Sequence, residues 1–181
     1  MRFRARFTRR RLLRVSTDIR WVEGPWKGKL AIAARPRGGD WLEDEIEAWQ
    51  RQGITTIVSL LTPEEEIDLG LVEESEIARS HGLNFLSVPV PDREIPPSES
   101  EVTAILARLH EILESGRNAV AHCRQGVGRA GLLASCMLVF EGKPPLEAIE
   151  LVSRARGVEV PETPDQRAWV LNYKVPTAGT V

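Results

Sequence analysis

The sequence has few of the features that build disulfide-linked or membrane-spanning proteins. Only two cysteines, Cys123 and Cys136, occur in 181 residues, too few for a disulfide framework. The longest apolar run, Leu132 to Phe140 with Ser135 inside it, is far short of the roughly 20 residues that cross a bilayer. No apolar signal-peptide core follows the N-terminus. We therefore expect a cytoplasmic protein without a membrane span, whose thiols stay reduced.

Internal repeats and low-complexity linkers are also absent, and apolar patterning runs without a break from about Trp21 to about Tyr173. A content of 42% apolar and 28% charged residues is that of an ordinary globular domain and excludes fibrous or fully disordered classes. We predict a basic N-terminal arm over residues 1–20, one domain over residues 21–175 and a short tail over residues 176–181.

Charge is distributed unevenly along the chain. Residues 1–37 hold 12 basic and 2 acidic groups, a net charge of +10, whereas residues 38–181 hold 12 basic and 24 acidic groups, a net charge of −12. The basic segment could be a solvated arm, an organelle transit peptide or a helix that contacts a membrane surface. A nucleic-acid partner is not expected, because no aromatic stacking platform or base-reading motif accompanies the arginines. The oligomeric state is left open.

Short apolar runs and amphipathic stretches alternate along the chain. The runs predict strands at Leu30–Ala33, Ile54–Leu61, Phe85–Val90 and Ala119–Ala121. The stretches predict helices over 41–52 with Asp40 as a candidate cap, over 99–115 with a capping box of Ser98 and Glu101, over 131–140, around 146–152 and from Thr163 onward. This alternation predicts an α/β fold with a mostly parallel central sheet flanked by helices, and a site at the carboxyl ends of the strands.

The most informative stretch is the ten-residue run HCRQGVGRAG, which begins at His122 and joins a predicted strand end to a predicted helix start. Gly126 and Gly128 allow successive backbone N–H groups to turn inward, and the following helix adds the positive end of its dipole. The oxygens of a phosphate group fit such a ring of donors. The expected phosphate-binding residues are Arg124, Gln125, Gly126, Val127, Gly128 and Arg129.

Two side chains of this run have the chemistry of phosphoryl transfer. Cys123 is nucleophilic only as a thiolate, a form that helix N-termini and nearby cations favour. Arg129 lies six residues further on and can present two parallel N–H donors to phosphate oxygens, a geometry that lysine cannot reproduce. We therefore predict that Cys123 attacks phosphorus while Arg129 binds the phosphate and stabilises the transition state.

The pattern of His-Cys, five residues and then Arg resembles the signature of the protein tyrosine phosphatase superfamily, and the chain looks most like its compact dual-specificity and kinase-associated members. The resemblance covers about residues 24–173. It implies a cysteine-phosphatase fold, a phosphocysteine intermediate, no metal or other cofactor, and a general acid on a mobile loop. The implied substrate is a phosphorylated protein or another phosphomonoester, with phosphotyrosine first and phosphoserine or phosphothreonine beside it.

A leaving phenolate or alkoxide needs a proton, which a carboxylic acid on a loop over the site can supply before it acts as a base toward water. Asp92 is the candidate, because it follows a predicted strand and lies 31 residues before Cys123. That order and spacing are similar to those of the compact dual-specificity phosphatases. An ordinary Pro-Asp turn is one alternative interpretation, and Glu94 is an alternative acid.

Three further positions carry expectations from the same resemblance. His122 supports the loop through a hydrogen bond to backbone, unless it is simply a buried histidine at a strand end. Gln166 aligns loosely with a glutamine that positions hydrolytic water in some members, although a capping box with Thr163 explains it as well. Ala130 stands where the family usually has serine or threonine, and the missing hydroxyl is expected to slow hydrolysis of the phosphocysteine.

Several other functions stay open at this point. A phosphoinositide or other polyphosphate phosphatase would use Arg124 in the loop, with Lys27, Lys29 and the basic arm holding extra phosphates. A rhodanese or an arsenate reductase can use a loop of similar spacing but needs no acid at Asp92. A phosphate-binding pseudophosphatase that docks a phosphorylated partner is the alternative outside enzymes.

Overall fold

The computed structural model describes residues 18–175 and contains one five-stranded sheet. Its strands are β1 (Ile19–Val22), β2 (Leu30–Ala34), β3 (Ile54–Ser59), β4 (Asn84–Ser87) and β5 (Asn118–Cys123). Their order is β1-β2-β5-β3-β4, in which β1 is antiparallel to β2 and all other neighbours are parallel. The predicted α/β class with a mostly parallel central sheet is confirmed.

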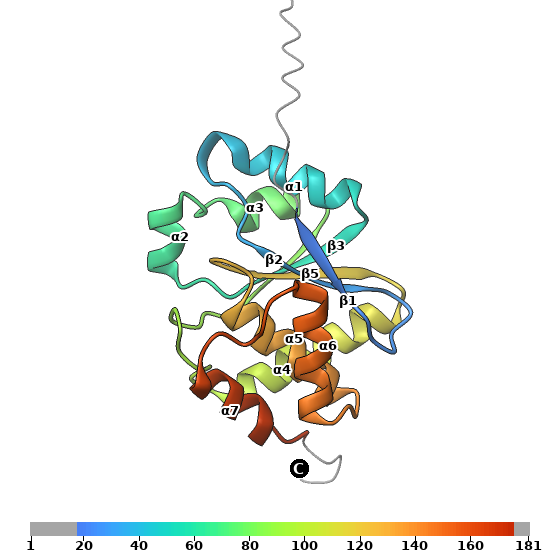
Figure 1. Cartoon of the computed structure of the whole chain (residues 1–181). Helices are drawn as coiled ribbons and strands as arrows, with labels where there is room; N and C mark the ends of the chain where they lie inside the picture. The colour runs from blue at the N-terminus through green and yellow to red at the C-terminus, as the bar shows by residue number, and fades with distance from the viewer. Residues whose placement is uncertain (1–17, 176–181) are drawn as a thin grey trace, which may run out of the picture.

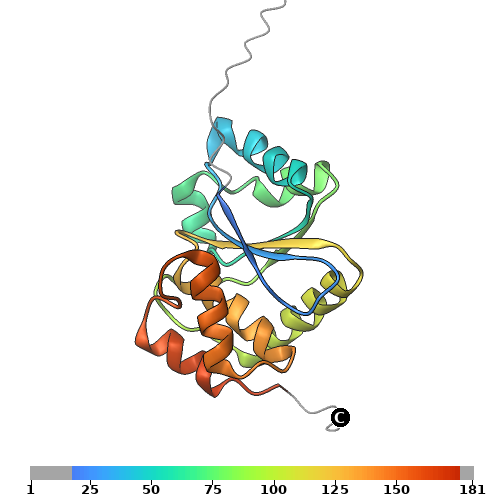
Figure 2. The same ribbon diagram turned by 45° about the vertical axis from the view of Figure 1, so that its right-hand side comes forward.

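Helices cover both faces of this sheet (Figures 1 and 2). The short helix η1 (Gly39–Trp41) leads into α1 (Leu42–Arg51), which lies on one face with α2 (Pro63–Leu69) and α3 (Glu74–Ser80). The opposite face carries α4 (Glu99–Glu114), α5 (Gly128–Phe140), α6 (Pro145–Arg156) and α7 (Pro164–Asn172). The fold is thus a sandwich of helices, sheet and helices.

Alternation along the strands divides their side chains between two cores, because successive residues of a strand point to opposite faces. In β5, Ala121 and Cys123 belong to the core shared with α4 to α7, whereas Val120 belongs to the core shared with α1 to α3. The same alternation turns His122 away from Cys123. The carboxyl end of β5 therefore presents the cysteine on the side where α5 begins.

Helix α5 is the centre of the larger core. Its residues from Gly128 to Val139 are all buried, since the helix lies between the sheet and its neighbours α4, α6 and α7. Such burial explains why its sequence is apolar all round rather than striped. By contrast, α4 buries one apolar stripe that includes Val102, Leu106 and Leu109, as its sequence pattern predicts.

The structure differs from the sequence-based expectations at several element ends. Asp40 does not cap a helix; it lies within η1, and no side chain caps α1. The hydroxyl of Ser98 accepts the N–H of Glu101 at the start of α4, but the return bond of a capping box is not made. Strand β4 ends at Ser87, three residues before the expected Val90, although the N–H groups of Val88 and Val90 still donate to the carbonyl oxygens of Ser59 and Leu60. β1 begins at Ile19, inside the segment assigned to the basic arm, most of which lies outside the described residues.

Within residues 18–175, none of the helices is both long enough and apolar enough to cross a bilayer.

Candidate active site

The loop between β5 and α5 folds back over the sulfur of Cys123. The backbone N–H of Gly126 points at this sulfur, with 3.3 Å between N and Sγ. Gly126 has a φ of +69°, and a Cβ there would lie 2.4 Å from the carbonyl group of Ala33 in β2. Only glycine permits both this conformation and this close approach. The tight turn required for an anion cradle is therefore built by the backbone itself.

Arg156 of α6 supports the loop from the side. Its Nε donates to the carbonyl oxygen of Gly126 at 2.9 Å, and its Nη2 donates to that of Gln125 at 3.1 Å. Both carbonyls point away from an anion site, so these bonds favour the orientation in which the loop's N–H groups face inward. Sequence analysis did not identify Arg156, which lies 30 residues from the loop it supports.

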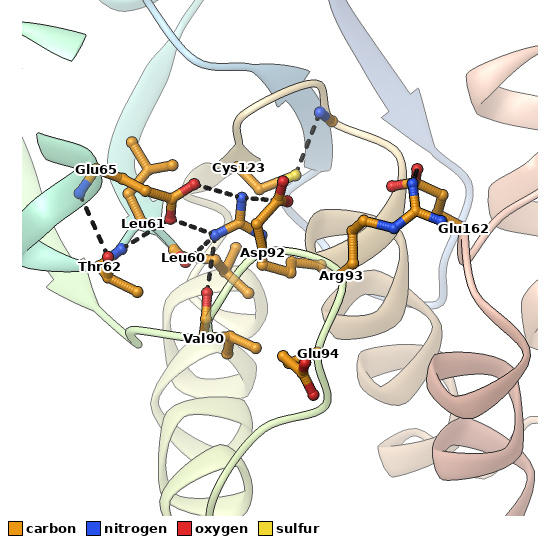
Figure 3. A network of polar contacts seen from close by, with 12 residues as sticks. Leu60, Leu61, Thr62, Glu65, Val90, Asp92, Arg93, Glu94, Cys123 and Glu162 are labelled. Carbon is orange, nitrogen blue, oxygen red and sulfur yellow. Dashed lines mark hydrogen bonds and ion pairs between the residues drawn. The ribbon is translucent and has the colours of Figure 1, made fainter. Parts of the chain in front are cut away.

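Arg129 is buried, with only 1% of its side chain exposed, and Glu65 of α2 binds it through two hydrogen bonds. The distances are 2.6 Å from Nη1 to Oε2 and 2.9 Å from Nη2 to Oε1 (Figure 3). Oε2 of Glu65 also accepts the N–H of Thr62, as part of a capping box that starts α2. The helix cap thus holds the carboxylate that in turn fixes the guanidinium.

The loop that carries Asp92 is closed over Arg129. Oδ1 of Asp92 accepts from Nη2 of Arg129 at 2.8 Å, and the carbonyl oxygen of Val90 accepts from Nη1 at 2.8 Å (Figure 3). Nη1 also lies 3.3 Å from the carbonyl oxygen of Leu60, at the end of β3. The guanidinium of Arg129 is therefore bound by residues from three places: the segment that follows β3, helix α2, and the loop that carries Val90 and Asp92.

The charges at this point influence one another. Burial raises the pKa of Glu65, but the hydrogen bond and charge of Arg129, with the N–H of Thr62, outweigh it and leave the pKa below its ordinary value. Burial opposes the charged form of Arg129, yet Glu65, Cys123 and Asp92 together raise its pKa. Glu65 and Arg129 therefore stabilise one another as an ion pair beside the sulfur.

A cavity of about 90 Å³ opens above Cys123. It is lined by Asp92, Arg93, Cys123, Arg124, Gln125, Gly128, Arg129, Glu162 and Gln166. The structure thus brings together the predicted nucleophile, the predicted acid and most of the predicted phosphate-binding loop. Gly126 and Val127 contribute to the loop without lining the cavity, and Glu94, the alternative acid, faces a neighbouring groove instead.

Gln166 forms the capping box considered for it, and its side chain also reaches the cavity. Its N–H and Oε1 complete a capping box with Thr163 at the start of α7, so the structural interpretation is confirmed. The side chain is also fully buried against the cavity, and its Nε2 donates to the carbonyl oxygen of Glu94 at 2.9 Å. A Cβ on Gly128 would lie 2.9 Å from Oε1 of Gln166, which shows how closely the loop and α7 approach each other.

His122 lies on the other face of the sheet. Its Nε2 is 2.9 Å from Oε1 of the buried Glu74, and its ring is 5.7 Å from that of Trp49 between centroids. The contact with Glu74 lacks the alignment of a hydrogen bond, and neither ring nitrogen has a hydrogen-bond partner within residues 18–175. The prediction that the ring of His122 hydrogen-bonds to backbone is therefore wrong. His122 is linked to the site only by the peptide bond to Cys123.

Lys27 and Lys29 lie at the wrong end of the sheet to bind a substrate phosphate near Cys123. In the register of β2 with β5, Leu30 pairs with Ala119 and Ala34 pairs with Cys123. At about 3.3 Å per residue, Lys29 is roughly 17 Å from the cysteine along the strand direction. Lys27 pairs with Glu114, and Lys29 lies over the ring of Trp21. The expectation that these lysines could hold extra phosphates is wrong.

Comparisons with known proteins agree with the fold and with this loop. Residues 31–143 match the family model described as "Polymorphic toxin system, DSP-PTPase phosphatase". The mouse (Mus musculus) protein "Protein tyrosine phosphatase domain-containing protein 1" is 30% identical over 151 residues, which cover 76% of this chain and 20% of the mouse protein. The chain therefore spans about a fifth of that relative.

Two solved structures share the fold. Kinase associated phosphatase, with its catalytic site cysteine changed to serine, has a TM-score of 0.80 at 20% identity, covering 87% of this chain and 94% of the other. The active form of Tk-PTP has a TM-score of 0.69 at 25% identity, covering 82% and 94%. Together with the family match, which covers more than half of the chain, these likenesses show that the chain belongs to the compact dual-specificity (DSP-PTPase) family of the protein tyrosine phosphatase superfamily.

Proposed function

We propose that the chain is a cysteine-dependent phosphatase that hydrolyses phosphotyrosine, together with phosphoserine and phosphothreonine, in proteins through a phosphocysteine intermediate. The observation that carries the proposal is the meeting of Cys123, Arg129 and Asp92 around one small cavity. Each has the chemistry that one part of the reaction needs, and Asp92 reaches the other two from a loop 31 residues before Cys123 in the chain.

In the first step the thiolate of Cys123 attacks phosphorus, a sulfur–phosphorus bond forms and the ester oxygen–phosphorus bond breaks. The leaving oxygen takes a proton from Asp92. Arg129 and the inward N–H groups of the loop bind the nonbridging oxygens and stabilise the charge of the transition state. The bidentate contact with Glu65 leaves the orientation of Arg129 set before substrate arrives, which lowers the reorganisation needed during reaction.

The contact between Asp92 and Arg129 supports a role for substrate in preparing the acid. Nη2 of Arg129 donates to the carboxyl group of Asp92. A bound phosphate would take over this donor, because its oxygens are stronger acceptors held closer to the loop. The carboxyl group of Asp92 would then be free to turn toward the leaving oxygen.

In the second step a water molecule attacks phosphorus, gives its proton to the carboxylate of Asp92, and the sulfur–phosphorus bond breaks. Inorganic phosphate leaves and the thiolate is restored. Ala130, which is buried next to Arg129, cannot donate a hydroxyl hydrogen bond to the departing sulfur. We therefore expect this step to be the slower one.

Release of phosphate from para-nitrophenyl phosphate tests the proposal. The wild-type protein should release phosphate, Cys123→Ser should release none, and Cys136→Ala, which alters the other cysteine outside the cavity, should remain active. A wild-type protein without turnover but with tight phosphate binding would instead identify a pseudophosphatase.

The acid is tested by comparing Asp92→Asn with Glu94→Gln, a matched change two residues away. Asp92→Asn should slow turnover of aryl phosphates with poor leaving groups by about 10²–10⁴-fold, the usual contribution of a general acid, and should slow good leaving groups much less. Glu94→Gln should leave both rates near wild type. An equal loss for good and poor leaving groups would remove Asp92 from this role.

A further inference from the structure

A groove of about 360 Å³ lies beside the catalytic cavity, between the loop that follows Asp92 and helix α7. Its apolar wall is formed by Ile95, Trp169 and Tyr173. The last two rings stack at 5.5 Å between centroids with an angle of 16° between their planes, and Ile95 is 40% exposed. Tyr173 is a core residue with 5% of its surface exposed, so the apolar surface that another chain could cover is that of Ile95 and of the half-buried Trp169. Covering it would remove apolar surface from water and favour association.

The rim of this groove is negative. Glu94, Glu99 and Asp165 line it, and none of the three carboxylates forms an ion pair with a residue in the described part of the chain, 18–175. The two ion pairs nearest in sequence, Arg93 with Glu162 and Arg167 with Glu159, use other carboxylates. Glu99 and Asp165 lie in the first turns of α4 and α7, where the helix dipoles stabilise negative charge. The groove therefore combines an apolar wall with three carboxylates that have no cationic side-chain partner within residues 18–175.

This charge lies next to a cavity that has to attract a dianion, which by itself would slow association. The arrangement becomes favourable if the substrate brings cations of its own. A lysine or arginine side chain fits the groove well, because its aliphatic stem can pack on Ile95 and the ring of Trp169 while its charged end meets the carboxylates.

The groove and the cavity have no lining residue in common, but they lie on either side of the contact between Gln166 and Glu94, so an extended ligand that crosses this contact can reach both. Glu94 follows Asp92 by two residues, and its carbonyl oxygen accepts from Nε2 of Gln166, a side chain that lines the cavity. Asp165, on the groove side, is the neighbour of Gln166 in α7. A chain with its phosphate above Cys123 therefore reaches the first turn of α7 once it passes over the contact between Gln166 and Glu94.

We propose that this groove, formed by Glu94, Ile95, Glu99, Asp165, Trp169 and Tyr173, binds the segment that flanks the phosphorylated residue of a protein substrate and selects segments rich in lysine or arginine. The inference rests on the proposed phosphatase activity and names the substrate class of that same site. A polyanionic ligand, such as a phosphoinositide headgroup, is disfavoured by the three carboxylates.

Phosphopeptides that differ only in the residues beside one phosphotyrosine test the inference, with flanks of lysine and arginine, of alanine, or of glutamate. For the wild-type protein, kcat/KM should follow the order basic, alanine, acidic, and the preference should shrink as salt is added. In the double variant Glu99→Gln/Asp165→Asn, the ratio of kcat/KM for the basic peptide to kcat/KM for the acidic peptide should fall by about two- to fivefold for each carboxylate removed. This is the effect expected for exposed charge pairs.

The matched control is Glu64→Gln/Glu76→Gln, which removes two exposed carboxylates from the first turns of α2 and α3 on the far side of the sheet. It should keep the full preference, and all three proteins should hydrolyse para-nitrophenyl phosphate equally. Equal rates on basic and acidic peptides, an equal loss in the control, or faster hydrolysis of phosphoinositide vesicles than of the basic peptide would overturn the groove assignment. Failure of the wild-type protein on para-nitrophenyl phosphate would instead overturn the proposed phosphatase activity.

Discussion

Glu65 binds Arg129 through two hydrogen bonds, although it neither lines the cavity nor belongs to the loop signature. Its two oxygens occupy one Nη hydrogen each and orient the plane of the guanidinium. The same carboxylate ends a capping box, so the start of α2 is rigidly linked to the site. Glu65 is best described as a positioning residue that acts through Arg129.

Replacing Glu65 by glutamine should separate this role from helix capping. Glutamine can still complete the capping box, but it removes the charge and one acceptor from Arg129. Because hydrogen bonds to charged groups contribute about 1.5–3 kcal/mol, kcat/KM for para-nitrophenyl phosphate should fall by about 10- to 100-fold, with a parallel loss of phosphate affinity. Glu64→Gln, on the exposed side of the same turn, should change neither. A loss of thermal stability with kcat/KM and phosphate affinity intact would show that Glu65 only supports the fold.

At this scale the sequence predicts the residues whose chemistry is local to a motif. Cys123, Arg129 and Asp92 converge in the structure as the loop pattern and the strand order imply. Glu65 and Arg156 could not be found in this way, because each reaches the site through a contact 30 or more residues away in the chain. Thr62 and Glu65 do have the spacing of a capping box, but that signal predicts a helix start and says nothing of a partner.

Among the elements, helix α7 contacts the site through its first turn, where the same residue, Gln166, takes part both in the helix cap and in a contact with the Asp92 loop. Thr163 and Gln166 form the capping box, while Nε2 of Gln166 holds the Asp92 loop by the carbonyl oxygen of Glu94. Other contacts also hold the loop: Arg129 donates to the carbonyl oxygen of Val90 and to the carboxylate of Asp92, and Arg93 forms an exposed ion pair with Glu162. Arg93 adopts a φ of +64°, which is uncommon for a residue other than glycine.

Two variants should separate capping from positioning in α7. Thr163→Ala removes the cap and should lower the free energy of unfolding by about 0.5–2 kcal/mol with little change in kcat. Gln166→Glu can keep the cap, but it removes the donor to the carbonyl of Glu94 and adds negative charge beside the phosphate. It should raise KM and lower kcat, and it should also lower the melting temperature, because the buried carboxylate would face the carbonyl oxygen of Glu94. Equal effects of both variants on catalysis would mean that Gln166 contributes only a cap.

The helices and strands with a clear apolar pattern in the sequence could be predicted, and those without one could not. The four apolar runs are strands and α4 has its predicted stripe, because both patterns reflect burial on a defined face. β1, α2 and α3 were not identified. β1 has only four residues with a charged neighbour at either end, and α2 and α3 have seven residues each, too few to show a clear period.

For the molecule as a whole, alternation in β5 divides titratable groups between the two faces of the sheet. Cys123 faces the cavity, while His122 and Glu74 are enclosed in the smaller core, where burial and the charge of Glu74 also raise the pKa of the half-buried Glu66. The larger core holds a second thiol, Cys136, fully buried in the middle of α5. Position within the layers, rather than residue type, decides which of these groups can meet a substrate.

The buried thiol should limit the stability of the whole molecule at alkaline pH. Burial, with a smaller contribution from the charge of Glu99, raises the pKa of Cys136 well above its ordinary value, whereas in the unfolded chain the thiol ionises near pH 8.5. Above that pH the folded state holds a proton that the unfolded state releases, so the free energy of unfolding falls by up to about 1.4 kcal/mol per pH unit.

Urea unfolding between pH 8 and pH 9 measures this slope, mostly below the range in which Tyr173, whose pKa burial also raises, would add to it with the same sign. Cys136→Ala is expected to be less stable than wild type at pH 8, because it leaves a small cavity, but to have a shallower slope. The difference between the two proteins should therefore narrow as the pH rises. A constant difference across this range would mean that the thiol ionises alike in the folded and unfolded chains, and that alkaline lability arises elsewhere in the molecule.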